Sequence, residues 1–342
     1  MAKAKEIEGL DCGRDVGEGV RLVLRTRVEE MCGLRAAALD WSDPEGVHDM
    51  RVASRRLRSA LRDFSPYLRG RKMRRVKGDL KSLADALGLV RDDDVAIMAL
   101  DKLAEEAPPE VCAGVGQFTD ERKRKRERAR ARLERALTED ALAELREDFN
   151  DALADGVKAR RRQDVGGEGR KETSVSFRRA GRKIILARLE EFQDLSASLY
   201  TPLKSETLHR LRIAAKRLRY ALELFAVCWD ESTLTPFARE IAKMQTSLGE
   251  LHDCDVWVEE IGEGLKRAGR EAVGGQHSET TAAGQKRRAA FWLLDHFTKE
   301  RTHHFHDALA RWHEWETTGF QSSLTDAISN KLPTELSAQG NI

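Results

Sequence analysis

The 342-residue chain balances 60 Lys and Arg against 58 Asp and Glu, so its net charge of +2 by itself predicts no special affinity for anions. The cations are unevenly spread, however: between His48 and Lys81 twelve basic residues meet three acidic ones, and local concentration is what attracts an anion. No stretch is apolar enough to cross a membrane, and the N-terminus lacks the apolar segment of a signal peptide, so we expect neither a membrane span nor secretion.

The cysteines are few and scattered, without the close spacing of a zinc site. An odd, widely spaced set is typical of reduced intracellular thiols rather than of a disulfide framework, so the sequence predicts a cytoplasmic protein. The five are Cys12, Cys32, Cys112, Cys228 and Cys254.

Apolar residues recur every three to four positions along the chain, which predicts helices, and alternating β-branched runs are essentially missing. In the first half the helices are expected over 15–39, 42–68, 72–106 and 112–160. In the second half they are expected over 173–199, 204–229, 234–267 and 280–315. Four helices in each half suit a four-helix bundle, so the predicted fold class is all-α.

The two halves carry the same pattern at a constant offset of 161 residues. HDMRVASRRLRSALRDF at 48–64 matches HRLRIAAKRLRYALELF at 209–225, and LGLVRDDDV at 87–95 matches LGELHDCDV at 248–256. Such a repeat predicts two copies of one unit. The expected organisation is an N-terminal bundle over 15–162, a glycine-containing linker over 163–174 and a C-terminal bundle over 175–318.

The repeated helix has two opposed faces when its residues are placed at 100° intervals. Leu57, Leu61 and Phe64 fall on one side of the first copy. A cationic ridge about four turns long falls on the other side, formed by His48, Arg51, Arg55, Arg58 and Arg62. The second copy repeats the ridge with His209, Arg212, Lys216 and Arg219, and has Glu223 in place of Arg62. Arg56 and Arg217 lie at the shoulder of each ridge.

A charged outer face is the ordinary explanation for one basic helix. Here the ridge has almost no interleaved acid, and like charges stacked at this spacing each cost a few tenths of a kcal/mol. A bound polyanion would remove that repulsion, and the planar fork of arginine matches phosphate oxygens. A ridge about 20 Å long suits a linear chain of phosphates better than one small ligand. The histidines would donate hydrogen bonds and gain charge beside the anion.

The paired segments VHDMRVASRRLRSAL and LHRLRIAAKRLRYALELF, each followed by LGxxxDxDV, resemble the CHAD family, the conserved histidine α-helical domain. The resemblance covers about residues 15–315. It implies two four-helix bundles related by a pseudo-two-fold axis, with a basic groove or pore between them. It also implies non-enzymatic binding of inorganic polyphosphate and association with polyphosphate granules. Some members carry a triphosphate-hydrolysing CYTH domain, for which this chain has no acidic, strand-rich region, so a stand-alone module is expected.

The implied ligands fall on both ridges, and the shoulder residues Arg56, Arg217 and the ridge end Arg62 are included with them. The principal set is His48, Arg51, Arg55, Arg58, His209, Arg212, Lys216 and Arg219. Second candidates come from the first and last helices of each copy: Arg21, Arg182, Arg126 and Arg287. We expect no cofactor, no metal, no catalytic residue and a monomer or weak dimer.

The acidic end of the second shared motif allows two interpretations. Carboxylates at 92–94 and at 253 and 255 suit Mg²⁺ or Ca²⁺. The preferred interpretation is that Asp92 and Asp94 pair with the shoulder arginine Arg56 and orient it, and that their counterparts do the same for Arg217. The His-rich run 303–315 is another conceivable metal site, although packing of its tryptophans at the end of the last helix is preferred.

Two other functions remain open. A nucleic-acid binder would also use a basic ridge and would weaken with salt, but the ridges have no aromatic residue on which bases stack. A metal-dependent phosphohydrolase is suggested by the pairs His48-Asp49 and His252-Asp253, which occupy non-equivalent places in the repeat. No catalytic triad, P-loop or dinucleotide fingerprint is present. Nucleic acid is therefore expected only as a weaker competitor of polyphosphate.

Overall fold

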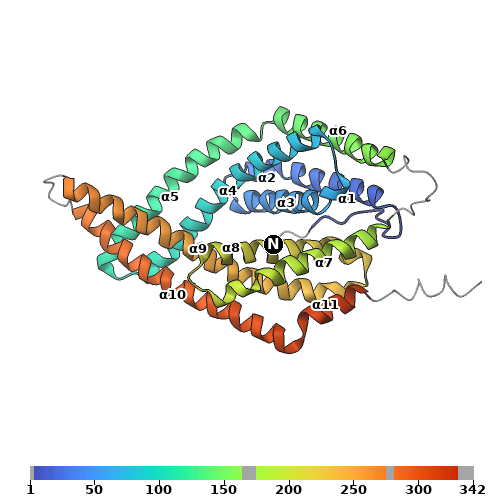
Figure 1. Cartoon of the computed structure of the whole chain (residues 1–342). Coiled ribbons are helices and arrows are strands. Elements are labelled where there is room, and N and C mark those ends of the chain that lie inside the picture. The colour runs from blue at the N-terminus through green and yellow to red at the C-terminus, as the bar shows by residue number, and fades with distance from the viewer. Residues whose placement is uncertain (1–3, 164–174, 275–280, 330–342) are drawn as a thin grey trace, which may run out of the picture. The chain divides into compact units, whose positions relative to one another are not determined.

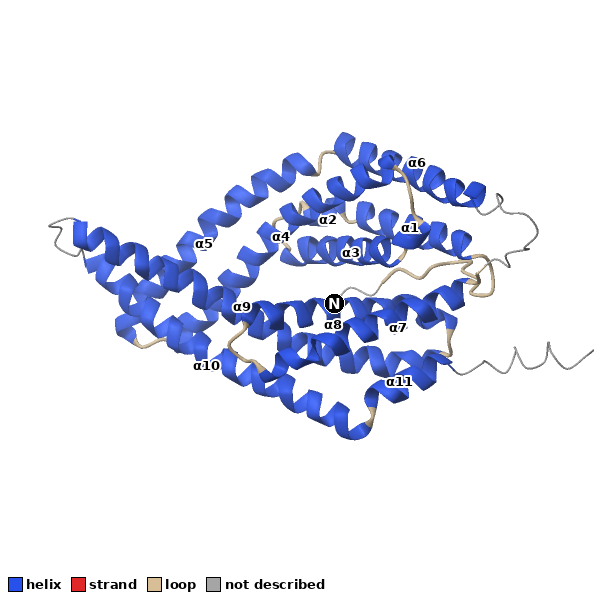
Figure 2. Ribbon diagram, in the orientation of Figure 1, coloured by secondary structure: helices blue, strands red, loops and turns tan. Residues whose placement is uncertain are grey.

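The computed structural model describes residues 4–163, 175–274 and 281–329. These divide into two compact units, Met1–Phe177 and Arg178–Ile342, each described below by itself. Helices dominate the chain (Figure 1), and no β-strand occurs among the described residues (Figure 2), which confirms the all-α prediction. Apart from Gln163, the predicted linker 163–174 lies outside the described residues.

Unit 1 contains five long helices and one short one. They are α1 (Val16–Gly33), α2 (Arg35–Ala38), α3 (Pro44–Asp63), α4 (Arg71–Glu106), α5 (Pro109–Ala136) and α6 (Glu139–Gln163). The 3₁₀ turn η1 (Ser65–Tyr67) connects α3 to α4. Within this unit α4 packs against α3, α5 and α6, and α1 packs against α3 and α6, so the core lies around α3 and α4.

The start of α3 follows the signal in its sequence. Asp43 is the N-cap, and its carboxylate accepts a hydrogen bond from the Glu45 backbone N–H at 2.9 Å, while Pro44 occupies the first helical position. A capping side chain satisfies one of the backbone donors that have no partner inside the helix, and proline has no N–H to lose there. Both features fix where α3 begins, and therefore where the ridge begins.

One predicted helix of unit 1, 112–160, is wrong as a single element. The chain breaks between α5 and α6, where the backbone N–H of Leu137 turns back to the carbonyls of Leu133 and Glu134. The Thr138 hydroxyl then accepts a hydrogen bond from the Ala141 backbone N–H at 3.3 Å, and α6 begins with acidic residues. A capping threonine followed by acidic residues is typical of a helix start. Leu137 is fully buried and continues the apolar spacing, so periodicity alone predicts one unbroken helix.

The described residues of unit 2 form five helices. They are α7 (Phe177–Leu195), α8 (Ser205–Phe225), α9 (Glu231–Gly274), α10 (Thr281–Thr318) and α11 (Phe320–Ser329), with 3₁₀ turns η2 (Ser196–Tyr200) and η3 (Ala226–Cys228). Its last predicted helix is also followed by a second one. Gly319, at φ +67°, makes the break, because a left-handed backbone is readily adopted only by glycine.

The tryptophans near the end of α10 pack against other aromatic rings, which agrees with the preferred interpretation of the His-rich run. Trp315 stacks on Phe320 of α11 with ring centroids 4.4 Å apart, and Trp312 meets Phe192 of α7 edge-on at 6.0 Å. Both tryptophans are at most 5 % exposed. His303 lies on the exposed side of the same helix, with its Nε2 atom 3.5 Å from Asp307.

The thiols of Cys32, Cys112 and Cys254 are free, which confirms the prediction of reduced cysteines for these three. The prediction is wrong for Cys12 and Cys228, which are disulfide-bonded. Burial is the main cause that raises the pKa of Cys32 to about 11 and that of Cys254 to about 12, so neither is a thiolate nucleophile at neutral pH. None of the helices in the described part of the chain is both long and apolar enough to span a membrane.

Candidate functional site

Helix α3 has the two faces that its sequence predicts. Met50, Leu57 and Leu61 on the apolar seam are at most 2 % exposed. We call the opposite face the α3 ridge, formed by His48, Arg51, Arg55, Arg58 and Arg62. Four of these side chains are half-buried and Arg62 is exposed. Burial of the seam, at roughly 1.5–3 kcal/mol per large side chain, holds the helix in place and leaves the ridge at the surface.

Arg51 is positioned by the neighbouring helix α4. Its Nη2 atom donates to Asp92 Oδ1 at 3.0 Å, and its Nε atom lies over Gly88, 3.9 Å from where a Cβ would stand. The contact with glycine recurs 161 residues later, where Arg212 Nε lies 3.9 Å from the Cβ position of Gly249. In both units, therefore, the glycine of the second shared motif has no side chain to displace the first arginine of the ridge, which lies over it.

Arg56 lies away from the ridge, in a buried ion cluster with the first helix. Its Nη1 atom is 3.5 Å from Glu30, and Arg27 contacts the other oxygen of the same carboxylate at 2.6 Å. The side chains of all three are 8–11 % exposed. The prediction that Asp92 and Asp94 orient Arg56 is wrong, because Glu30 provides the carboxylate. Arg56, one of the predicted ligands, thus has little surface to offer an anion.

The same cluster recurs at the 161-residue offset in unit 2. Arg188 contacts Glu191 at 2.9 Å, and Arg217 donates to the other oxygen of that carboxylate. These side chains are 19–27 % exposed, so they are less deeply buried than their counterparts. A carboxylate between two arginines ties the ridge helix to the first helix of each unit. Breaking such a pair leaves an uncompensated buried charge, which makes the cluster a structural requirement.

The α8 ridge of unit 2 is shorter than the sequence predicts. Arg219 is only 4 % exposed and donates to Glu223 at 2.8 Å and to Gln245 at 3.2 Å, with its guanidinium near the ring of Tyr220. A buried arginine held by a carboxylate contributes little positive field at the surface. We therefore use "α8 ridge" for His209, Arg212 and Lys216, all half-buried.

The histidines differ between the ridges. In unit 2, His209 and His252 lie ring against ring, with Nδ1 atoms 3.3 Å apart and centroids 4.3 Å apart. Burial, followed by the nearby cations Arg212 and Lys216, lowers the pKa of His209. The same causes, together with His209 itself, lower the pKa of His252 to about 4. Both rings are thus neutral at neutral pH, and an anion is the natural means of charging them.

In unit 1 the position of His252 is occupied by Arg91. Its Nη1 atom is 3.4 Å from Glu45 Oε1, and the Arg91 side chain is 13 % exposed. Burial and then Arg91 lower the pKa of His48, with Glu45 acting in the opposite direction. Unit 1 therefore has a permanently charged arginine, Arg91, at the position where unit 2 has His252, whose charge depends on pH.

The four arginines predicted as second candidates lie on helices other than α3 and α8. Arg126 pairs with Asp94 at 3.3 Å, and Arg182 donates to Ser329 Oγ on α11 at 3.1 Å. Arg21 is half-buried on α1, and Arg287 is exposed on α10. These contacts assign Arg126 and Arg182 to packing between helices.

The family comparison decides how this pair of ridges is classified. The sequence model of the CHAD domain matches residues 22–262, which include both ridges and both LGxxxDxDV segments. The chain belongs to the CHAD domain family. The matched range ends in α9, so Arg287 and the His-rich end of α10 lie beyond it.

Two solved structures share the CHAD fold of this chain. The crystal structure of the CHAD domain from the plant Ricinus communis is 20 % identical, with a TM-score of 0.68, covering 90 % of this chain and 95 % of the plant domain. PptA from Streptomyces chartreusis is 14 % identical, with a TM-score of 0.63, covering 88 % of this chain and 100 % of PptA. A comparison with curated proteins gave no match. At these identities the structures support the fold alone.

The acidic segment of this CHAD chain binds arginine side chains across helices. Asp93 pairs with Arg122 of α5 at 3.3 Å, as Asp94 does with Arg126, and both carboxylates are at most 7 % exposed as residues. In unit 2 Asp255 pairs with Arg301 of α10 at 2.5 Å. Pairing with arginine was the expected role, but Asp94 and Asp255 pair with the following helix, and Asp92 pairs with Arg51 on the ridge instead of with the shoulder.

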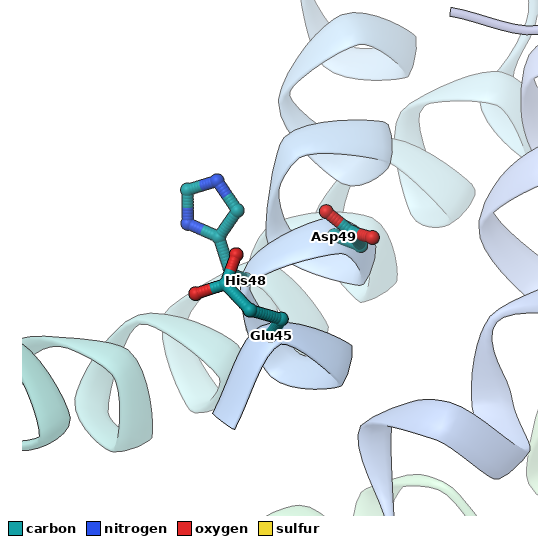
Figure 3. Close-up of side chains that lie close together, drawn as sticks. All are labelled: Glu45, His48 and Asp49. Atoms are coloured by element: carbon teal, nitrogen blue, oxygen red, sulfur yellow. The ribbon is translucent and has the colours of Figure 1, made fainter. Parts of the chain in front are cut away.

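Within the described residues, one group of side chains could hold a metal ion. Glu45, His48 and Asp49 lie together at the start of α3 (Figure 3), with their ligand atoms within 4.8 Å of one another. Glu45 already pairs with Arg91, so a guanidinium competes for this carboxylate. The group provides no buried, pre-oriented set of ligands of the kind that Zn²⁺ or Mg²⁺ sites require.

Proposed function

We propose that this CHAD protein binds inorganic polyphosphate without hydrolysing it, using the α3 and α8 ridges. The observation that carries the proposal is the α3 ridge itself, where four arginines and one histidine share a single helix face. Its opposite face is an apolar seam, and Asp92 of the neighbouring helix α4 orients the ridge arginine Arg51. Preoriented guanidinium groups lower the ordering cost of binding a phosphate chain. Association with polyphosphate granules in the cell is part of this proposal.

The test is calorimetric titration of long-chain polyphosphate into the wild-type protein and the variant Arg55→Glu/Lys216→Glu. We expect the variant to lose binding while its helical circular dichroism is retained. A matched control, Lys102→Glu/Lys266→Glu, changes the net charge equally at exposed positions of α4 and α9. Wild-type affinity in the ridge variant, with the control also unchanged, would contradict the proposal.

Nucleic acid is the competing ligand for any basic helix face. The ridge positions carry no aromatic side chain on which bases could stack, so we expect the protein to bind polyphosphate more tightly than nucleic acid. Long-chain polyphosphate is expected to displace single-stranded RNA from the protein at physiological salt. Failure of this displacement would support nucleic acid as the ligand.

The absence of enzymatic activity is tested separately. Incubation of the protein with polyphosphate and Mg²⁺ or Mn²⁺ should release no orthophosphate. Steady release that is abolished by His48→Ala would instead assign a hydrolytic role to the group in Figure 3.

A further inference from the structure

A second concentration of positive charge lies at the start of α4, outside the α3 ridge. It lines a surface pocket of about 360 Å³. The lining residues are Leu68, Arg69, Gly70, Arg71, Met73, Arg74 and Lys77. Four of the seven are cations and none is acidic. We call this the α4 pocket.

The cations of the α4 pocket differ from their neighbours on the same turns. Lys72 pairs with Asp155 at 3.0 Å and Arg75 with Asp148 at 3.7 Å, so the side of α4 that faces α6 is matched by carboxylates. No carboxylate of the described chain pairs with Arg71, Arg74 or Lys77. Lys77 is half-buried, and burial lowers its pKa. A solvated charged face would not place a lysine under this desolvation cost without a partner.

The backbone at the pocket adds to the positive field. Gly70, at φ +115°, is the N-cap of α4 and provides no side chain to cap the first N–H groups, and the first turn holds no acidic residue. The N-terminus of a long helix carries partial positive charge that favours an anion. Here it meets arginines instead, so an anion in the pocket would relieve repulsion from both sources.

The α4 pocket and the residues of α4 that contact the α3 ridge lie on the same face of α4. Residues 92, 88, 81, 77 and 74 fall within about 60° of one another on α4 at 100° per residue. Asp92 and Gly88 of this row contact Arg51, at the beginning of the α3 ridge. The row then runs about 20 Å along α4 to Arg74. Helices α3 and α4 pack together and are joined by the short connection 64–70 that follows Arg62 (Figure 1).

Unit 2 lacks this arrangement. The chain between the two shared motifs has the same length in both halves, and η1 and η3 occupy the same offset positions. The ridge end Arg62 corresponds to Glu223. The four pocket cations correspond to Asp230, Ser232, Thr235 and Ala238. Unit 2 thus has two acids and three neutral residues where unit 1 has five cations.

We propose that the α4 pocket binds further phosphoryl groups of the polyphosphate chain held on the α3 ridge, so that unit 1 holds a longer stretch of the chain than unit 2. The inference rests on the proposed function. Arg71 and Arg74 would each present a planar fork to phosphate oxygens, and Lys77 would contribute a point charge. The consequence is a dependence on chain length that the two ridges alone would not produce.

The test compares the variant Arg71→Glu/Arg74→Glu with the wild-type protein and with the control Lys102→Glu/Lys266→Glu. Each is titrated with tripolyphosphate and with long-chain polyphosphate at the same salt concentration. We expect the pocket variant to bind tripolyphosphate like the control. For long-chain polyphosphate we expect it to bind at least about tenfold more weakly than the control, which corresponds to about 1.4 kcal/mol.

Three outcomes would overturn the inference. Equal losses of long-chain affinity in the pocket variant and the control would show an effect of net charge alone. A loss of tripolyphosphate binding would make the pocket an independent small-anion site. Wild-type binding of long chains by the pocket variant, together with loss in Arg55→Glu/Lys216→Glu, would reject the pocket and leave the proposed function standing. If the ridge variant also binds normally, the proposed function itself fails.

Discussion

The His209–His252 pair predicts that polyphosphate binding takes up protons. Without an anion, burial and then the cation Arg212 hold the pKa of His252 at about 4, against an ordinary value of 6.5. A phosphate chain on Arg212 and Lys216 would offset their field and raise this pKa towards its ordinary value. The bound protein would then carry a proton that the free protein lacks between about pH 4 and pH 6.5, so affinity should rise as the pH falls through this window.

The size of the effect follows from the two pKa values. If binding restores a pKa of 6.5, lowering the pH from about 7.5 to about 5.5 should raise the binding constant about tenfold for this one histidine. The low pKa of His252 also makes the stability of the free protein depend on pH, and stability changes with pH in the opposite direction to binding affinity. Since the folded pKa is depressed, stability is greatest above pH 6.5 and falls as the pH is lowered towards 4.

The variant His252→Arg isolates this contribution. It places in unit 2 the arginine that unit 1 has at position 91, and Glu206 stands at the 161-residue offset from Glu45, the partner of Arg91. Calorimetry with long-chain polyphosphate in buffers of different ionisation enthalpy measures the protons taken up. We expect His252→Arg to take up fewer protons than wild type near pH 5.5, and the exposed control His306→Arg to match wild type. Equal proton uptake in all three proteins would refute the reasoning.

Three further predictions concern stability and salt. Glu30→Gln should cost about 3 kcal/mol in urea unfolding, because it removes the carboxylate that the buried Arg27 and Arg56 share. Glu139→Gln, at an 83 % exposed side chain, should change stability by less than about 0.5 kcal/mol, and equal losses would contradict this. Leu57→Ala, at a fully buried seam position, should cost about 3 kcal/mol, and a loss below about 1 kcal/mol would show that the seam is not core. Arg55→Ala should make the dependence of polyphosphate affinity on salt shallower by about one counterion, and an unchanged slope would place Arg55 outside the binding surface.

Helical periodicity predicted the fold and the ridge because both depend on the local spacing of apolar and charged residues. The seam of Met50, Leu57 and Leu61 and the ridge opposite it follow directly from 3.6 residues per turn. The start of α3 at Pro44 was equally predictable, because the capping aspartate and the proline adjoin it in sequence. The break at Leu137 was missed because a buried leucine continues the apolar pattern while Thr138 ends the helix.

Partners that are distant in sequence could not be predicted from spacing. Glu30, rather than Asp92 or Asp94, binds Arg56, and this depends on how α1 packs against α3. The burial of Arg219 with Glu223 likewise depends on α9, which supplies Gln245. One signal was present in the sequence: Arg27, Glu30 and Arg56 all recur at the 161-residue offset as Arg188, Glu191 and Arg217. A repeated acid on the first helix, beside a repeated arginine on the second, indicates a structural pair.

The most direct test of the central claim is a crystal structure of the full chain with bound polyphosphate. The account predicts phosphate oxygens within hydrogen-bond distance of Arg51, Arg55 and Arg58 on α3 and of Arg212 and Lys216 on α8, with Arg56 and Arg219 still bound to Glu30 and Glu223. Phosphate density only on other surfaces of the protein, with both ridges uncontacted, would contradict it.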